Sequence, residues 1–327
     1  MTCPLPRDVL EEALGVRQFS LREVRGGYSK QVYEALCGED RRMLYLWQRP
    51  YAGALTDNRT EGADYLFSSG VACFLYNSKL LAETGVRTPR VYASGHWERG
   101  GVSYAVVERL PGVSLEQYRS EGGDLAAVGC KITELLQRLS ACRRAFYGPP
   151  LETRPYPLPP EQLALRFYLE ELRIASALDP GARRLRPRLE ARLRRLAQKA
   201  GLEPLADYGL IHGELTPPHV FLLQNGELAL IDLEGATFFD AAFEWAAVSL
   251  HYGGAVPTPS SVDRNRLALY RLCLRIGYLS CAVDFLAHVD AQSDFFQGLR
   301  DGTLRALQTA KDNPVQSSEQ VKGGATT

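Results

Sequence analysis

The feature that most constrains this chain is a short polar segment set between stretches with helical spacing. It starts at Leu210–Ile211, continues through His212–His219, and ends at Ile231–Glu234 after a second apolar run. Residues of this kind predict a strand, a polar turn and a hairpin that bring acids close together. Asp232 lies between Ile231 and Leu233, where an unpaired buried carboxylate would be costly. A divalent cation is the natural partner for it.

Length and charge set broad limits on the class of protein. The 327 residues are enough for two lobes with a sizeable core, and 45% apolar with 23% charged residues is ordinary for a globular protein. Lysine plus arginine equals aspartate plus glutamate, at 38 each. This balance argues against a general binder of nucleic acid or membrane surfaces, which needs a net basic face.

Cysteine use and the ends of the chain bear on location. The seven cysteines are scattered and include no C-x-x-C pair, so we expect free thiols in a reducing cytosol. The N-terminal residues lack the apolar core of a signal peptide, and no run approaches the roughly 18 apolar residues of a membrane span. We therefore expect a cytoplasmic protein.

The first part of the chain has the spacing of short strands around one helix. Tyr65–Thr84 has helical spacing, although Gly70 weakens its middle, and Gly85 stands where a C-terminal helix glycine is expected. The expected strands are Leu21–Arg25, Gln31–Cys37, Met43–Trp47, Arg90–Ser94 and Ser103–Glu108.

After Gly112 the pattern becomes helical. Pro149–Pro160 is expected to be an extended connector, and the Gly-, Ser- and Thr-rich residues 312–327 a disordered tail. The expected helices are Leu125–Arg144, Glu161–Ala177, Pro187–Ala200, Ala241–His251, Val262–Tyr278 and Ser280–His288. The sequence thus predicts an α+β protein with an N-terminal lobe at 1–109 and a larger helical lobe at 110–311.

The polar segment resembles the signatures of a known family. His212-Gly213-Glu214 with His219, and then Ile231–Glu234, are similar to the His-Gly-Asp-x-x-x-x-Asn and Ile-Asp-x-Glu motifs of the aminoglycoside phosphotransferase family. Glu214 replaces the usual Asp and His219 the usual Asn. The motifs follow in family order over about residues 20–290. The resemblance implies a protein-kinase-like fold with two lobes, ATP or GTP as donor, and Mg²⁺.

The resemblance also implies roles for the site residues. Glu214 would orient or deprotonate the acceptor hydroxyl, although its extra methylene moves the carboxylate by about 1 Å, and His212 belongs to the catalytic set as a holder of loop geometry. Asp232 would be the main metal ligand. His219 is either a second ligand or a loop-holding group; macrolide-modifying relatives are similar in carrying histidine there. Glu234 either helps to hold the metal or is a solvated turn acid. Glu244 would accept backbone hydrogen bonds from the catalytic loop.

On the nucleotide side the resemblance implies a phosphate loop, a cation and a hinge. Gly26, Gly27 and Ser29 would form the loop, and Glu108 to Leu110 the hinge that receives adenine. The phosphate-binding lysine of the third strand falls on Gln48. Arg49 is adjacent but would point to the opposite face unless a bulge intervenes, and Phe74 or a neighbour stands where a helix glutamate is common.

The acceptor side is less constrained. Candidate lining residues are Glu161–Glu171, Tyr252, Asp284, Asp290 and Asp294, and solvated helix faces would have the same composition. The basic segment Arg183–Lys199 is either a solvated face or a surface for an acidic partner protein. We expect a phosphotransferase acting on a hydroxyl of a natural product or antibiotic. A Ser/Thr kinase for a precursor peptide of lanthipeptide-like pathways, and a pseudokinase scaffold, are the alternatives.

Overall fold

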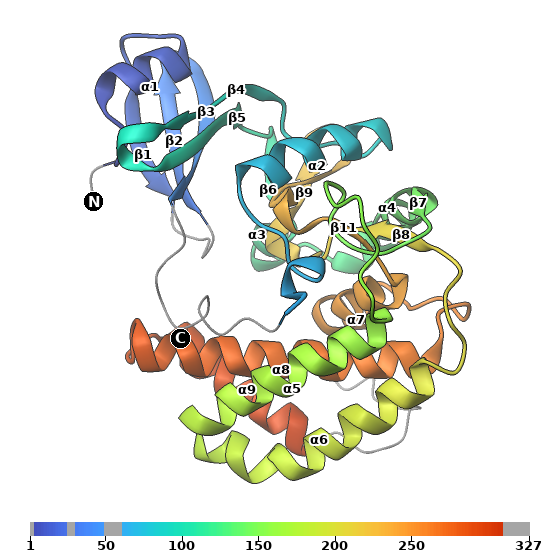
Figure 1. Cartoon of the computed structure of the whole chain (residues 1–327). Helices are drawn as coiled ribbons and strands as arrows, with labels where there is room; N and C mark the ends of the chain where they lie inside the picture. Colours follow the sequence, from blue (N-terminus) through green and yellow to red (C-terminus); the bar gives the residue numbers. More distant parts are fainter. Residues whose placement is uncertain (1–2, 25–29, 49–60, 310–327) are drawn as a thin grey trace.

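The computed structural model describes residues 3–24, 30–48 and 61–309, which form two lobes joined near residue 110 (Figure 1). The N-terminal lobe holds a five-stranded antiparallel sheet, and helices dominate the C-terminal lobe. This confirms the predicted α+β class with a small β-rich lobe and a larger helical one. The tail predicted to be disordered, residues 312–327, lies outside the described residues.

The N-terminal sheet has the strand order β1-β2-β3-β5-β4. Its strands are β1 (Ser20–Val24), β2 (Gln31–Cys37), β3 (Asp40–Gln48), β4 (Val91–Trp97) and β5 (Val102–Glu108). β2 and β3 pair with Val32 opposite Tyr45 and Gln31 opposite Leu46. The five predicted strands are all present, each within a few residues of its expected bounds, because β-prone runs bounded by turn residues mark them in the sequence.

Alternation along β3 separates the two faces of this sheet. Leu44 and Leu46 point to one face, where α1 (Arg7–Leu14) covers them. Tyr45 and Trp47 point to the other face, toward α2 (Val71–Glu83) and the C-terminal lobe. This second face lies toward the polar segment, because Trp47 Nε1 donates a hydrogen bond to Glu234.

α2 is shorter than the predicted helix at Tyr65–Thr84. A single 3₁₀ turn, η1 (Ala63–Tyr65), precedes it, and Gly70 is its N-cap instead of a weak point in its middle. Gly70 has a φ of 95°, which a helix interior does not accept. Gly85, with a φ of 77°, ends the helix as expected, and its N–H donates to the Ala82 carbonyl.

Two small sheets support the polar segment. β6 (Gly112–Ser114) pairs with β9 (Val220–Leu223), which pairs with β10 (Leu228–Leu230), and this ties the chain after the hinge to the hairpin. The second sheet joins β7 (Arg143–Arg144), β8 (Tyr208–Ile211) and β11 (Thr237–Phe239). α3 (Leu115–Ser120) and α4 (Gly129–Ala141) lie beside them, with the 3₁₀ turn η3 (Leu125–Val128) leading into α4.

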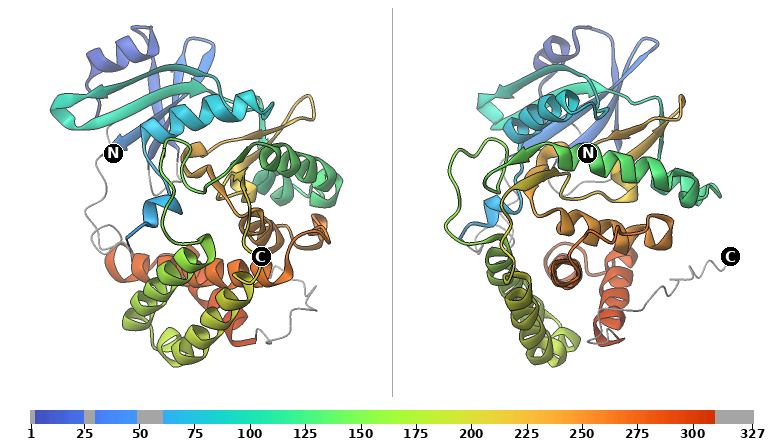
Figure 2. Two further views of the ribbon diagram at one scale, coloured as in Figure 1. Left: turned by 45° about the vertical axis from the view of Figure 1, so that its right-hand side comes forward. Right: turned by 90° about the vertical axis from the view of Figure 1, so that its right-hand side faces the viewer.

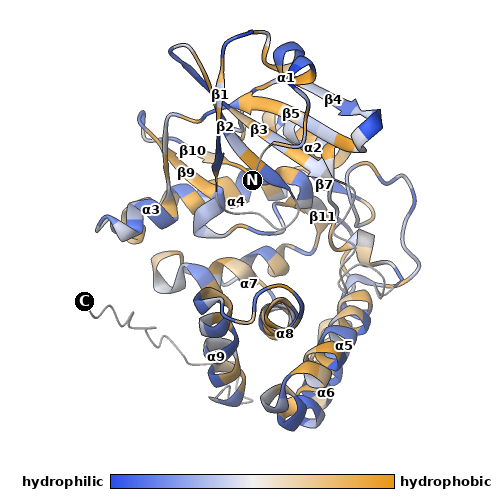
Figure 3. Ribbon diagram, turned by 90° about the vertical axis from the view of Figure 1, so that its left-hand side faces the viewer, coloured by the Kyte–Doolittle hydropathy of each residue, from blue (hydrophilic) through white to orange (hydrophobic). Residues whose placement is uncertain are grey.

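Four long helices form the base of the C-terminal lobe (Figure 2). They are α5 (Pro160–Leu178), α6 (Pro180–Ala200), α8 (Arg264–His288) and α9 (Asp294–Thr309). Figure 3 shows α8 end-on, between α9 on one side and α5 and α6 on the other. Above them α7 (Ala241–His251) follows β11 directly.

Several predicted helix bounds were wrong. The predicted helices Val262–Tyr278 and Ser280–His288 are one helix, α8, and α9 was not predicted. α6 begins at Pro180, and Pro187 lies inside it. The true start signal is Asp179, whose side chain accepts the Ala182 N–H as an N-cap. Proline at the first helical position fits this start.

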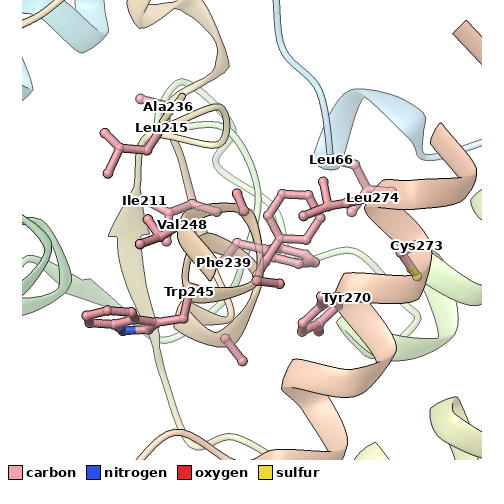
Figure 4. Packing of buried hydrophobic residues seen from close by; sticks show 14 of the residues in the cluster. Leu66, Ile211, Leu215, Ala236, Phe239, Trp245, Val248, Tyr270, Cys273 and Leu274 are labelled. Atoms are coloured by element: carbon pink, nitrogen blue, oxygen red, sulfur yellow. The ribbon is translucent and has the colours of Figure 1, made fainter. Parts of the chain in front are cut away.

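A continuous apolar core lies beneath the polar segment (Figure 4). Ile211 and Leu215 belong to the same cluster as Phe239 and Trp245, and Tyr270 of α8 lies beside Phe239 with ring centroids 5.8 Å apart. Because the loop is rooted in this core, its polar side chains are held on a rigid base. Among the described residues, no helix combines the length and the apolar character needed to cross a membrane.

Candidate active site

The loop His212–His219 leaves β8 and lies against the turn that follows β10. Pairing of β8 with β11 puts Ile211 opposite Thr237 and brings the two turns together. Gly213 has a φ of 85°, and a Cβ at this position would lie 2.7 Å from the carbonyl oxygen of Gly235. Glycine is therefore required here for both its backbone angle and its lack of a side chain.

Glu244 of α7 shapes the catalytic loop from beneath, as the sequence predicted. Its carboxylate accepts the backbone N–H groups of His212, of Gly213 at 3.1 Å and of Leu215 at 3.3 Å. The side chain is almost fully buried. Burial raises the pKa of Glu244 to about 7, and the three N–H donors act to lower it. The carboxylate thus organises backbone and has no path to a substrate.

His212 is a buried, neutral tie between the two turns. Its Nε2 donates to the Ile231 carbonyl at 2.9 Å, and its Nδ1 accepts the Glu214 N–H at 3.3 Å. These two bonds require the tautomer with the proton on Nε2. Burial lowers the pKa of His212 to about 4. His212 therefore positions Glu214 and does not react itself.

Asp232 has an unusual backbone conformation at the end of the β10 strand. Its φ of 62° and ψ of 55° are left-handed, and it is the one non-glycine residue with positive φ in the described part of the chain. Such a conformation costs about 1–3 kcal/mol and tends to occur at functional sites. Burial opposes ionisation of Asp232, but Lys30 and His219 outweigh burial and lower its pKa.

Three of the predicted site residues converge on one point. Glu214, His219 and Asp232 each offer a ligand atom, and these atoms lie within 4.8 Å of one another. His219 Nδ1 donates to the Glu214 carbonyl at 2.9 Å, so a neutral ring turns an unprotonated Nε2 toward Asp232 Oδ2, 3.5 Å away. The lone pairs of His219 Nε2 and Asp232 Oδ2 then face each other, and this arrangement favours a cation between the two atoms.

Glu234 is buried, so the alternative of a solvated turn acid is wrong. One carboxylate oxygen, Oε1, accepts from Lys30 Nζ at 2.6 Å and from Trp47 Nε1 at 3.0 Å. The other, Oε2, is buried and has no hydrogen-bond partner among the described residues. An unpartnered buried carboxylate oxygen next to Asp232 suits a divalent cation, and the oxygen-rich set fits magnesium. Asp232 and His219, with Glu234 beside them, are the residues that would hold it.

The cation of the site is Lys30, which sequence reasoning missed. Its Nζ donates to Asp232 Oδ1 and Glu234 Oε1, and its side chain is only 6% exposed. Burial disfavours its charge, but Glu234 and Asp232 outweigh burial and raise the pKa of Lys30. The sequence signal was a lone lysine after the Gly26-Gly27 pair, one residue before β2.

An aromatic residue stands next to the expected lysine position on the third strand. Trp47 points toward α2, and its ring packs on Phe74 with centroids 5.4 Å apart. Gln48 is the last residue of β3, opposite Val102. Arg49, together with Gly26, Gly27 and Ser29 of the expected phosphate loop, lies outside the described residues.

α2 is fastened to the turn that carries the metal-site acids. Asn77 Nδ2 donates to the carbonyl groups of Leu233 (2.8 Å), Glu234 (3.2 Å) and Ala236 (3.1 Å). Ser68 Oγ donates to the Glu234 carbonyl at 2.6 Å. These contacts hold the left-handed turn at Asp232 in place. Asn77 is a polar residue on the buried face of an apolar helix, and that is the signal which could have identified it.

At the hinge, Glu108 is held by basic neighbours. It pairs with Arg87 at 2.5 Å and accepts the Arg90 N–H at 3.0 Å. Leu110 is buried, and its carbonyl accepts the Gly112 N–H at 3.0 Å. The Glu108 side chain therefore stabilises the strand exit, and adenine recognition by backbone groups at 108–110 stays a prediction.

Glu214 stands at the mouth of the site. Its side chain is exposed on one side, while protein surrounds it on the others. This partial removal from water raises the pKa of Glu214, and Asp232 acts in the same direction. A carboxylate whose pKa is raised toward neutrality is a better proton acceptor.

Most of the acidic residues expected near the acceptor have structural partners. Glu161 is buried and lies 3.7 Å from Arg266 in an ion cluster of the C-terminal lobe. Asp284 is buried and pairs with His288 at 3.1 Å. Tyr252 is also buried. None of these three reaches the mouth of the site as a free group.

α8 carries two side chains, Tyr278 and Cys281, whose pKa values the charge of Glu214 raises. Tyr278 makes a 2.8 Å hydrogen bond with His251 Nε2. Burial raises the pKa of Cys281 to about 11 and also raises that of Tyr278, and Glu214 adds to both shifts through its charge.

The basic segment Arg183–Lys199 forms most of α6. Arg183 donates to the Ser176 carbonyl at 3.1 Å, and Arg186 pairs with Glu190 at 2.6 Å. Arg188 donates to the Gln308 carbonyl at 3.3 Å and joins α6 to the end of α9. Part of this charge therefore stabilises helix packing, and a partner-protein surface here stays a prediction.

Comparison with known proteins places this geometry among phosphate-transferring enzymes. Residues 20–279 match the model described as the phosphotransferase enzyme family (APH). A thermostable mutant of aminoglycoside phosphotransferase APH(4)-Ia, in its apo form, is similar with a TM-score of 0.63 and 17% identity over 93% of this chain and all (100%) of that one. No curated protein matches the chain by sequence.

Two further solved structures share the fold. Another mutant of the same enzyme, in a ternary complex with ADP and hygromycin B, has a TM-score of 0.60 and 16% identity over 93% of this chain and 99% of that chain. Choline kinase LicA from Streptococcus pneumoniae has a TM-score of 0.58 and 14% identity over 93% and 99%. These likenesses confirm the predicted protein-kinase-like fold.

Proposed function

The chain belongs to the phosphotransferase enzyme family, as a kinase whose acceptor is an alcohol group, and from that premise we propose its donor and acceptor. The donor is a nucleoside triphosphate, ATP or GTP, and the acceptor is a hydroxyl of a natural product such as an antibiotic. The observation that carries the proposal is the exposed Glu214 carboxylate beside the facing pair His219 Nε2 and Asp232 Oδ2, 3.5 Å apart.

The chain's own residues divide the work. As the acceptor hydroxyl oxygen bonds to the γ-phosphorus, its proton passes to a carboxylate oxygen of Glu214, and the bond from the γ-phosphorus to the β,γ-bridging oxygen breaks, which releases the nucleoside diphosphate. His212 and Glu244 hold the backbone that sets the direction of Glu214. Asp232 and His219 would hold magnesium, which when bound neutralises charge on the phosphate oxygens. Positioning and charge then supply most of the rate, as phosphoryl transfer requires.

Two structural neighbours support a small-molecule acceptor. One binds hygromycin B together with ADP, and the other is a choline kinase. Glu214 is exposed to solvent, so an acceptor hydroxyl can reach its carboxylate. The cytoplasmic location predicted from the cysteines stays a prediction.

The test is transfer of labelled γ-phosphate from ATP or GTP to a panel of hydroxylated antibiotics. Glu214→Gln should reduce transfer by about 10²–10⁴-fold with little change in nucleotide affinity, since general-base catalysis is worth that factor. Glu116→Gln, an exposed acid on α3, is the matched control and should keep full activity. Transfer to Ser/Thr peptides alone would replace the proposal with a peptide kinase. Nucleotide binding without any transfer would favour a pseudokinase.

A further inference from the structure

We propose that Lys30 is the phosphate-binding cation of this protein, and that Glu234 is its carboxylate partner in place of a residue on α2. The inference rests on the proposed use of a nucleoside triphosphate and names the residue that receives the donor's phosphates. Lys30 lies one position before β2, whereas the family resemblance places the phosphate-binding lysine on the neighbouring strand β3.

The strand register explains how the cation can change strands. Gln31 lies opposite Leu46, and continuing the register by one residue puts Lys30 opposite Trp47 on the same face of the sheet. Neighbouring strands lie about 4.8 Å apart, and lysine carries its ammonium on a flexible four-carbon stem. An ammonium from β2 therefore reaches the volume that a lysine at position 47 would use.

The aromatic residues fill the positions that an ion pair between β3 and α2 would occupy. Trp47 packs on Phe74 with centroids 5.4 Å apart, and Tyr45 packs on the same ring at 5.6 Å. Lys30 Nζ lies 5.2 Å from the Tyr45 centroid and 5.9 Å from that of Trp47. Rings at this distance stabilise a cation. The aromatic cluster thus replaces the pair and at the same time supports the relocated ammonium.

The ammonium is connected to the catalytic acids. It donates to Asp232 and Glu234, and its charge also acts on Glu214. Trp47 Nε1 donates to the same Glu234 oxygen, which fixes the carboxylate against the sheet. An ammonium has three N–H donors, and these two carboxylates use two of them. A third N–H remains for a phosphate oxygen of a nucleotide at Asp232.

The buried Glu234 and the half-buried Asp232 lie beside one ammonium, so with both carboxylates ionised the cluster has one excess negative charge. A cluster built only for stability would be expected to balance its charges, because a buried unpaired charge is costly. The excess charge suits a site that takes up further positive charge with its ligand. A flexible lysine is the group in the cluster able to turn from carboxylate to phosphate without moving the backbone.

The test compares ligands that differ only in phosphates. Titration calorimetry in magnesium buffer measures the Kd of ATP and of adenosine for wild type, Lys30→Met and Lys30→Arg. Lys30→Met should weaken ATP binding by about 10- to 100-fold, the value of a hydrogen bond between charged groups, and leave adenosine binding unchanged. Lys30→Arg should recover most of the ATP affinity. Lys79→Met, an exposed lysine on α2, is the matched control.

If Lys30→Met does not fold, Lys30→Gln/Glu234→Gln removes the ammonium together with its buried partner and should show the same selective loss of ATP affinity. Equal loss for ATP and adenosine, or unchanged ATP affinity, would overturn the assignment of Lys30 and leave the proposed function standing. ATP binding that depends on Lys30, without transfer to any acceptor, would support the assignment and overturn the proposed function. A wild-type protein that binds no nucleotide would overturn both.

Discussion

At the residue scale, the catalytic loop depends on Glu244, whose carboxylate accepts three backbone N–H groups. We expect Glu244→Gln to lower the free energy of unfolding by about 1–3 kcal/mol, because an amide offers one acceptor and turns an N–H₂ group toward donors. Phosphate transfer should fall as well, since Glu214 loses its support. Urea denaturation measures the first effect, with the exposed Glu116→Gln as control.

A second prediction at this scale concerns the pH dependence of stability. Burial lowers the pKa of His212 to about 4 from an ordinary 6.5, so between these values the unfolded chain binds more protons. His212 therefore contributes stability above pH 6.5 that is lost as the pH falls toward 4. From pH 7 to pH 5 the loss is about 2 kcal/mol. Urea titrations without metal measure the free energy of unfolding at both pH values. Between pH 7 and pH 5 it should fall by about 2 kcal/mol less in His212→Gln than in wild type. Equal decreases in the two proteins would contradict the prediction.

The sequence predicted the metal-site and catalytic residues better than the residues that hold them in place. Asp232, His219 and Glu214 converge as their spacing indicated. Lys30 and Asn77 were missed because each acts across more than 150 residues of sequence, on Asp232, Glu234 and the carbonyl groups that follow. No local pattern encodes such a contact. It arises when the sheet and the hairpin dock.

At the element scale, α2 acts as the link between the N-terminal sheet and the metal-site turn. Phe74 faces the sheet, and Asn77, one turn later on the same side, reaches three carbonyl groups of the turn. We expect Asn77→Ala to cost about 1–3 kcal/mol by leaving buried carbonyl groups without donors. Hydrogen exchange at 232–236 should speed up. Lys79→Ala, two residues away and exposed, should change neither.

Element bounds were predicted well for strands and less well for long helices. Short β-prone runs between turn residues were enough to locate β1 to β5. For helices, a break was expected at Leu279, which lies inside α8, and a helix start was expected at Pro187, which lies inside α6. Tertiary packing in the helical base outweighs the local cost of Pro187. Asp179 as an N-cap was the better signal.

At the scale of the whole molecule, the two lobes are joined at the site by Lys30 of the N-terminal lobe, which donates to Asp232 and Glu234 of the C-terminal lobe. A ligand that binds the folded protein alone must raise its apparent stability, by about 2.7 kcal/mol at a hundredfold excess over Kd. We expect ATP with magnesium to raise the melting temperature and a chelator to remove the magnesium-dependent part. Asp232→Asn should abolish that part, and Asp8→Asn, an exposed acid in α1, should retain it. A shift that survives the chelator would argue against the metal site.

Trp47 gives this protein an optical property that its sequence alone did not disclose. Its indole N–H is bonded to Glu234 at the centre of the site, and the other two tryptophans, Trp97 and Trp245, lie on β4 and α7. Indole emission responds to nearby charge. Arrival of phosphates or a metal beside Lys30 should therefore change the intensity or wavelength of Trp47 fluorescence. The protein carries its own spectroscopic reporter of donor binding, usable without a label.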